Sequence, residues 1–220
     1  MKVAPADLEH SGLTDAAVLE RTASGVEESG ASELADRILD ATLGLVARWG
    51  VGKTSLADVA KAAGCSRATL YRTFPGGKQH LFARLGQREL DVYLSAILDA
   101  VDTADDLGDA LTRGLVVGAR LLRDHEGAQF VIEHEPELLV PFLGFKEVDV
   151  LYAHISDVAG PHLARFVPED RARWAAEWAS RLFITYLFNP SAEIDLVDVD
   201  QTRDLVAAYV LPAFGEPRPA

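Results

Sequence analysis

A short predicted helix over residues 67–74 carries side chains suited to the edges of base pairs and to phosphate oxygens. Arg67 has a guanidinium that can donate two hydrogen bonds to O6 and N7 of guanine. Ala68 is small enough to let the helix approach closely, and its methyl group can contact thymine. Thr69 and Tyr71 carry hydroxyls that suit phosphate oxygens. This set near the start of a short helix predicts a surface for double-stranded nucleic acid.

Two short predicted helices, 55–63 and 66–74, frame that surface. A tight turn at Gly64-Cys65 joins them, and Ser66 is placed to cap the second helix. Two short helices joined by a tight turn are typical of a helix-turn-helix. In this motif the second helix enters the major groove with its N-terminus first.

Residues before and after this pair extend the predicted interface. Lys53 and Thr54 precede the first of the two helices, where backbone N–H groups without a helical partner favour a phosphate. The full set of candidate DNA contacts is Lys53, Thr54, Ser66, Arg67, Ala68, Thr69, Tyr71, Arg72 and Lys78.

The distribution of charge supports the same interpretation. The whole chain of 220 residues has a formal net charge of −13. Residues 31–88 contain nine Lys and Arg but four Asp and Glu, a net charge of +5, whereas all other residues together carry −18. A local excess of positive charge favours phosphate binding by releasing counterions. The acidic remainder should limit DNA contact to one end of the molecule.

The segment GKTSLADVAKAAGCSRATLYRTF at 52–74 resembles the DNA-binding signature of the TetR family of bacterial repressors. The resemblance covers about residues 31–90 and implies an all-helical homodimer that binds an operator and a small-molecule ligand. Carried over by position, it implies DNA contacts for Thr54, Arg67, Thr69, Tyr71 and Lys78, and core positions for Leu70 and Phe74.

The sequence departs from the family pattern at two places. Ala68 replaces a frequent Gly, and the turn Phe74-Pro75-Gly76-Gly77-Lys78 is one residue longer than usual. A Gly also takes the place of the usual capping Ser or Asn. We expect Lys78 to reach phosphate from the next helix.

Apolar periodicity predicts helices along the chain and therefore an all-α fold. The resemblance to the family implies that the N-terminal three-helix domain binds DNA and that a larger C-terminal helical domain binds a ligand and forms the dimer. The expected domains are a flexible acidic tail at 1–30, the helix-turn-helix domain at 31–77, the ligand-binding domain at 78–214 and a frayed tail at 215–220. Further predicted helices are 32–49, 78–101, 105–123, 127–134, 145–158, 169–188 and 201–213.

Large apolar side chains in the C-terminal part fit either ordinary core packing or a ligand pocket between helices. The candidate pocket residues are Phe130, Phe142, Phe145, Tyr152, Trp178, Phe183 and Tyr186. Residues 133–138 and 180–191 are similar to a branch of the family whose members often respond to fatty acids or acyl thioesters. The expected effector is therefore a hydrophobic small molecule, with an acyl compound as the first candidate.

The predicted helices 169–188 and 201–213 are the candidates for a homodimer interface. Trp174, Trp178 and Leu182 lie four residues apart and share one face of the first helix. By analogy with the family, these helices would pair with their mates as a four-helix bundle.

Other classes of protein fit the sequence less well than a regulator does. Four histidines among carboxylates provide metal-ligand types, but without helical metal-binding spacing, so we expect no metal site and no cofactor. Nucleophile-elbow and phosphate-loop motifs are absent, which argues against an enzyme; a helical carrier or enzyme without DNA binding is the alternative. The single cysteine, Cys65, and the lack of a leader or membrane-spanning segment predict a cytoplasmic protein.

Overall fold

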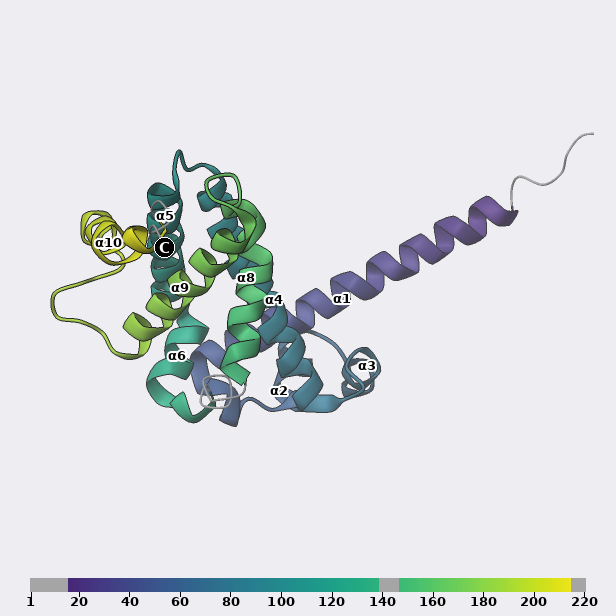
Figure 1. The fold of residues 1–220 in the computed structure, drawn as a ribbon. Coiled ribbons are helices and arrows are strands. Elements are labelled where there is room, and N and C mark those ends of the chain that lie inside the picture. Colours follow the sequence, from purple (N-terminus) through teal and green to yellow (C-terminus); the bar gives the residue numbers. More distant parts are fainter. Residues whose placement is uncertain (1–15, 139–146, 215–220) are drawn as a thin grey trace, which may run out of the picture. The chain divides into compact units, whose positions relative to one another are not determined.

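The computed structural model describes residues 16–138 and 147–214, and every regular element within those ranges is a helix (Figure 1). The all-α prediction is therefore confirmed. The described chain forms two compact units. The first contains the residues up to Thr42 together with Ser55–Leu81, and the second contains Leu43–Thr54 and the residues from Phe82 onward.

Helix α1 (Ala16–Lys53) begins well before the predicted start at Ser32, so part of the predicted tail is helical. The sequence missed this extension because residues 16–30 have no regular apolar spacing. Gly50, which directly follows the predicted helix 32–49, interrupts α1 with φ of 80° and ψ of 171°. This left-handed backbone suits glycine, and a last turn up to Lys53 follows it.

The first unit is completed by α2 (Leu56–Ala62), α3 (Arg67–Thr73) and the start of α4 (Gly77–Asp102). Its core consists of apolar side chains that face inward from each of these helices. The buried members are Ile38, Leu39, Val59, Ala60, Ala63, Leu70, Phe74 and Leu81. The predicted core positions of Leu70 and Phe74 are thus confirmed. One face of α3 therefore packs in the core of the first unit.

The second unit contains the rest of α4 and all later elements. They are α5 (Leu107–Asp124), α6 (Glu126–His134), the 3-10 turn η1 (Pro136–Leu138), α8 (Glu147–Leu163), α9 (Glu169–Phe188), α10 (Val199–Leu205), the π-helical turn η2 (Val206–Val210) and the 3-10 turn η3 (Leu211–Ala213). The helices predicted at 78–101, 105–123, 127–134 and 169–188 agree with these bounds within two residues.

Small residues let α8 and α9 pack closely along each other in this unit. Ala172, Ala175 and Ala176 on α9 are buried, and they join a core to which α4, α5, α8 and the C-terminal turns contribute. The core includes Leu111 and Leu115 of α5. This packing surrounds the cavity described below.

Two predicted helices differ from the structure. The helix predicted over 145–158 corresponds to α8, which continues to Leu163 with Pro161 inside it. Proline lacks one N–H, yet the Ala164 amide still donates to the Gly160 carbonyl at 3.0 Å, so the last turn persists. The helix predicted over 201–213 changes to π and then 3-10 geometry before and around Pro212.

None of the described helices combines the length and the apolar character that crossing a bilayer requires.

Candidate nucleic-acid interface and ligand cavity

Both helices of the predicted helix-turn-helix begin at a serine cap. The Ser55 hydroxyl accepts a hydrogen bond from the Asp58 amide at 3.2 Å, and the Ser66 hydroxyl accepts one from the Thr69 amide at 3.0 Å. Gly64 in the turn has φ of 64°, a conformation that glycine adopts without steric cost. These caps satisfy backbone donors that would otherwise have no partner, and they fix where α3 starts.

Helix α3 presents a polar face opposite its buried Leu70. Leu70 is 0% exposed, whereas Tyr71 is 51% exposed. Most of the candidate contacts on and beside α3 are exposed: Ser66, Arg67, Ala68, Tyr71 and Arg72. Thr69 is half-buried, with its hydroxyl 2.9 Å from that of Ser66. The first turn of α3 therefore offers a guanidinium, a methyl group and hydroxyls on one accessible surface.

Thr54 requires a correction. Its side chain is 1% exposed, and its hydroxyl donates to the Gly50 carbonyl at 2.7 Å. That hydroxyl closes the last turn of α1 and cannot serve a phosphate at the same time. Lys53 beside it is exposed.

The glycine-rich turn before α4 places Lys78 in the first turn of that helix. The Gly77 amide donates to the Phe74 carbonyl at 2.9 Å, and Gly77 has φ of 64°. Phe74 is buried, which anchors the start of the turn, while Lys78 is exposed. An exposed ammonium at a helix N-terminus is well placed to meet a phosphate.

Glu135, just after α6, binds the chain that leads into α2. Its two carboxylate oxygens accept hydrogen bonds from the Val51 amide at 2.7 Å and the Gly52 amide at 2.8 Å. The sequence did not reveal this contact because the partners are 84 and 83 residues apart. Gly50 matters to the approach, since an added Cβ would lie 2.5 Å from Cε1 of Phe130.

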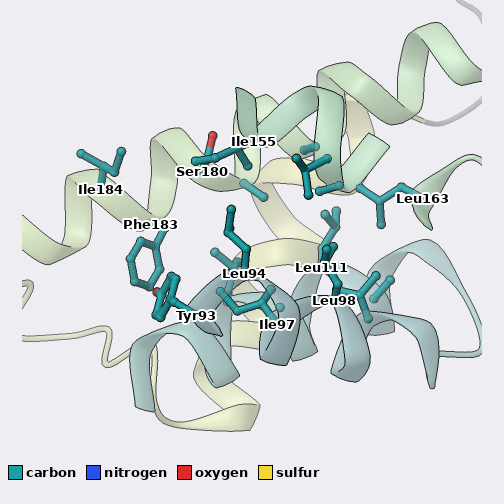
Figure 2. Close-up of a pocket in the computed structure, with 18 residues that line it drawn as sticks. Tyr93, Leu94, Ile97, Leu98, Leu111, Ile155, Leu163, Ser180, Phe183 and Ile184 are labelled. Atoms are coloured by element: carbon teal, nitrogen blue, oxygen red, sulfur yellow. The ribbon is translucent and has the colours of Figure 1, made fainter. Parts of the chain in front are cut away.

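The second unit contains a partly open cavity of about 120 Å³ between α4, α5, α8 and α9. Figure 2 shows the side chains of Leu94, Ile97, Leu111, Ile155 and Phe183 among those around it. Its lining is almost wholly apolar. A hydrophobic ligand is the occupant that such a lining favours.

The predicted pocket residues lie in several places. Phe183 lines the cavity, and with Tyr186 it also lines a second, more polar pocket of about 350 Å³. Tyr152 is buried with the Arg181 guanidinium 4.2 Å from its ring centre, and Trp178 is 44% exposed.

The remaining predicted pocket residues lie elsewhere. Phe130 stacks on His134 with ring centres 4.5 Å apart, and Phe142 and Phe145 lie outside the described residues. Sequence reasoning overlooked the cavity residues of α4, although Tyr93, Ile97 and Val101 recur at the four-residue spacing of a helix face.

Two of the histidines considered as metal ligands have protein partners with structural roles. His125 caps α6: its Nδ1 accepts from the Ala128 amide at 3.0 Å, and its Nε2 lies 3.2 Å from Glu89. His162 Nδ1 lies 2.8 Å from an Asp102 carboxylate oxygen. In the part of the chain that the structure describes, no three His, Cys, Asp or Glu side chains gather in a way that could hold a metal ion.

Comparison with known proteins decides the family. Residues 38–85 match the profile of bacterial regulatory proteins of the tetR family. An uncharacterized HTH-type transcriptional regulator of Mycobacterium tuberculosis is 30% identical over 187 residues, covering 81% of this chain and 84% of the relative. The chain belongs to the TetR family. It is therefore a DNA-binding transcriptional regulator, and the alternatives of a helical enzyme or carrier are set aside.

Solved structures share the TetR fold over most of the chain. The TetR family repressor AlkX of a Dietzia strain, implicated in biodegradation of n-alkanes, has a TM-score of 0.60 at 24% identity and covers 80% of this chain and 94% of its own. The fatty acid degradation regulator FadR of Bacillus halodurans has a TM-score of 0.59 at 20% identity, covering 80% and 96%.

For a TetR regulator, the exposed Lys78 should act on all DNA sequences alike. If Lys78 binds a phosphate, we expect Lys78→Ala to weaken specific and non-specific binding equally and to reduce the salt slope by about one per site. Arg113→Ala on α5, whose guanidinium pairs with Asp109 at 2.8 Å, removes a charge of the same sign as a control. Titrations of fluorescent DNA at several salt concentrations measure both quantities; an unchanged slope for Lys78→Ala would contradict this contact.

The hydrogen bonds of Glu135 should stabilise the backbone at Val51 and Gly52, just before the DNA-binding helices α2 and α3 of this TetR chain. Glu135→Gln keeps one acceptor oxygen but loses the charge, so we expect the opening free energy of the Val51 and Gly52 amides to fall by about 1 kcal/mol. Glu137→Gln makes the same change on exposed η1 and should leave these amides unaffected. Native-state hydrogen exchange measures the difference, and equal protection in both variants would argue against the contact.

Proposed function

We propose that the protein is a homodimeric, ligand-responsive repressor. The observation that carries this proposal is a capped α3 with exposed Arg67, Tyr71 and Arg72, in a chain that also contains an apolar cavity. Each α3 of the dimer enters the major groove of one half-site of a near-palindromic operator. The two-fold axis of the dimer sets the half-sites about one helical turn apart, or slightly more.

Exposed aromatic side chains on α9 and after α10 support a dimer. Trp174 and Trp178 on α9 are 45% and 44% exposed, and Tyr209 on η2 is 76% exposed. These segments are the ones expected from the sequence to form the interface. Burying large aromatic side chains against a second copy removes apolar surface from water, which favours association.

A hydrophobic small molecule is the proposed effector. The apolar cavity supports this, and so does the sequence similarity to family members that respond to fatty acids or acyl thioesters. The descriptions of AlkX and FadR concern n-alkane and fatty acid degradation, which places hydrocarbon-chain compounds first among ligands to test. A ligand that binds better to the dimer conformation with poor DNA fit shifts the population away from the operator.

The experiment combines stoichiometry with ligand response. Purified protein is mixed with the DNA that flanks its own gene, and the complex is sized by sedimentation with and without hydrocarbon-chain ligands. The proposal predicts two chains per operator and release of DNA by at least one apolar ligand. A complex with one chain per operator would contradict the dimer, and tighter DNA binding with ligand would contradict the release.

A further inference from the structure

Among residues 16–138 and 147–214, none of the side chains that line the cavity between α4, α5, α8 and α9 is charged. Its walls are built from Leu, Ile, Val, Ala, Gly and Phe, with Tyr93 and Ser180 as the polar exceptions. In Figure 2 the interior-facing sticks are almost all carbon. An ion that entered this space would lose its water without meeting an opposite charge, which is strongly unfavourable.

The two hydroxyl groups in the lining are already used as donors. Tyr93 donates to the Gly118 carbonyl at 3.0 Å, and Ser180 donates to the Glu177 carbonyl at 2.7 Å. Burial raises the pKa of the Tyr93 phenol well above its usual range, so it stays neutral. Figure 2 shows the Ser180 hydroxyl pointing away from Leu94. A ligand carboxylate would therefore find no unused hydrogen-bond donor on these side chains.

Arginines close along the chain to the lining are also engaged. Arg165 donates to the backbone carbonyls of Val101 at 2.6 Å and Asp102 at 2.8 Å. Arg181 makes two hydrogen bonds to Glu177. To reach a ligand carboxylate, either side chain would have to give up partners that it already holds.

The second pocket, which Phe183 also lines, does not supply a better anion site. Arg123 and Asp195 both line it and lie 3.5 Å apart as an ion pair. A ligand carboxylate that reached Arg123 in this pocket would also meet the Asp195 carboxylate, which repels it.

We propose that the effector of this regulator is an uncharged hydrocarbon-chain molecule, such as an alcohol or ester, and that ionised fatty acids are excluded. This inference rests on the proposed function, because it names the ligand class of the same cavity. It also narrows that function, since the acyl compounds suggested by the sequence include carboxylates.

The test compares three ligands with the same ten-carbon chain on the full-length protein by calorimetry. They are decanol, methyl decanoate and decanoate. At about pH 8 we expect both neutral ligands to bind and decanoate to bind more than about tenfold more weakly. As the pH falls toward about 5, decanoate becomes protonated, and its apparent affinity should rise by about tenfold per pH unit.

A cavity-filling variant locates the binding. Ala179→Phe places a ring in the lining and should abolish binding of decanol and methyl decanoate, whereas Ala83→Phe on the exposed face of α4 should leave it unchanged. If Ala179→Phe fails to fold, as judged by circular dichroism, the pH series on the unmodified protein still tests whether ionised decanoate is excluded.

Equal affinity of decanoate and methyl decanoate at about pH 8 would overturn the inference, and so would the failure of both neutral ligands to bind. Release of DNA is scored in a separate assay. Neutral-ligand binding without release would leave the inference standing and contradict the ligand-responsive part of the proposed function. DNA release by decanoate at that pH would contradict the inference and leave the ligand-responsive part of the proposed function standing.

Discussion

Replacing Arg67 with alanine is expected to weaken binding to the specific operator by about 1–3 kcal/mol, or roughly 5- to 150-fold. Arg67 is the first residue of α3, it is exposed, and the Ser66 cap fixes its position. The proposed contact is a pair of hydrogen bonds to one guanine, so the variant should also lose its preference at that base pair. Competition titrations with operators altered one base pair at a time measure both effects.

Arg67→Lys separates base reading from simple charge. Lysine keeps the positive charge but lacks the planar fork that can hold O6 and N7 together. We expect it to lose nearly as much operator affinity as alanine while retaining most of the non-specific affinity. If Arg67→Lys binds the operator like the original protein, Arg67 contacts phosphate rather than a base.

Among changes in α3 that leave its exposed side chains unaltered, Leu70→Ala should lower the free energy of unfolding most. Leu70 is 0% exposed and packs in the core of the first unit, so its loss leaves a cavity and is expected to destabilise that unit by about 2–5 kcal/mol. Hydrogen exchange of the α2 and α3 amides should show the loss directly. DNA binding should fall with it, because the exposed face of α3 depends on the buried one.

Leu121→Ala provides the matched control. It deletes the same atoms from a leucine on α5 that is 37% exposed, so the expected loss is below about 1 kcal/mol. The two variants differ in burial rather than in chemistry. Similar protection of the α2 and α3 amides in both variants would mean that Leu70 does not hold the first unit together.

Local signals explain why the DNA-binding helices were predictable from the sequence. Ser55 and Ser66 define helix starts, Gly64 defines the turn, and the four-residue spacing of Leu70 and Phe74 defines the inward face. Each of these acts within one or two turns of the chain, and the structure contains all of them. The bounds of the central C-terminal helices followed from the same kind of information.

Long-range features were not predictable. The Glu135 contact with Val51 and Gly52 joins distant segments, and no local pattern marks it. The cavity arises where four helices fail to fill the space between them, which depends on packing rather than on any one residue type. Thr54 shows the reverse error: its hydroxyl seemed available in the sequence, but the fold uses it to bond Gly50.

Salt-dependent competition binding is the measurement that tests the central claim most directly. The protein is titrated onto DNA flanking its own gene at about 50 mM and about 200 mM salt, with unrelated DNA as competitor. We predict selective binding that weakens steeply with salt, and loss of the selectivity alone in Arg67→Ala. Equal affinity for both DNAs at each salt concentration, or selectivity unchanged in Arg67→Ala, would contradict recognition of an operator through α3.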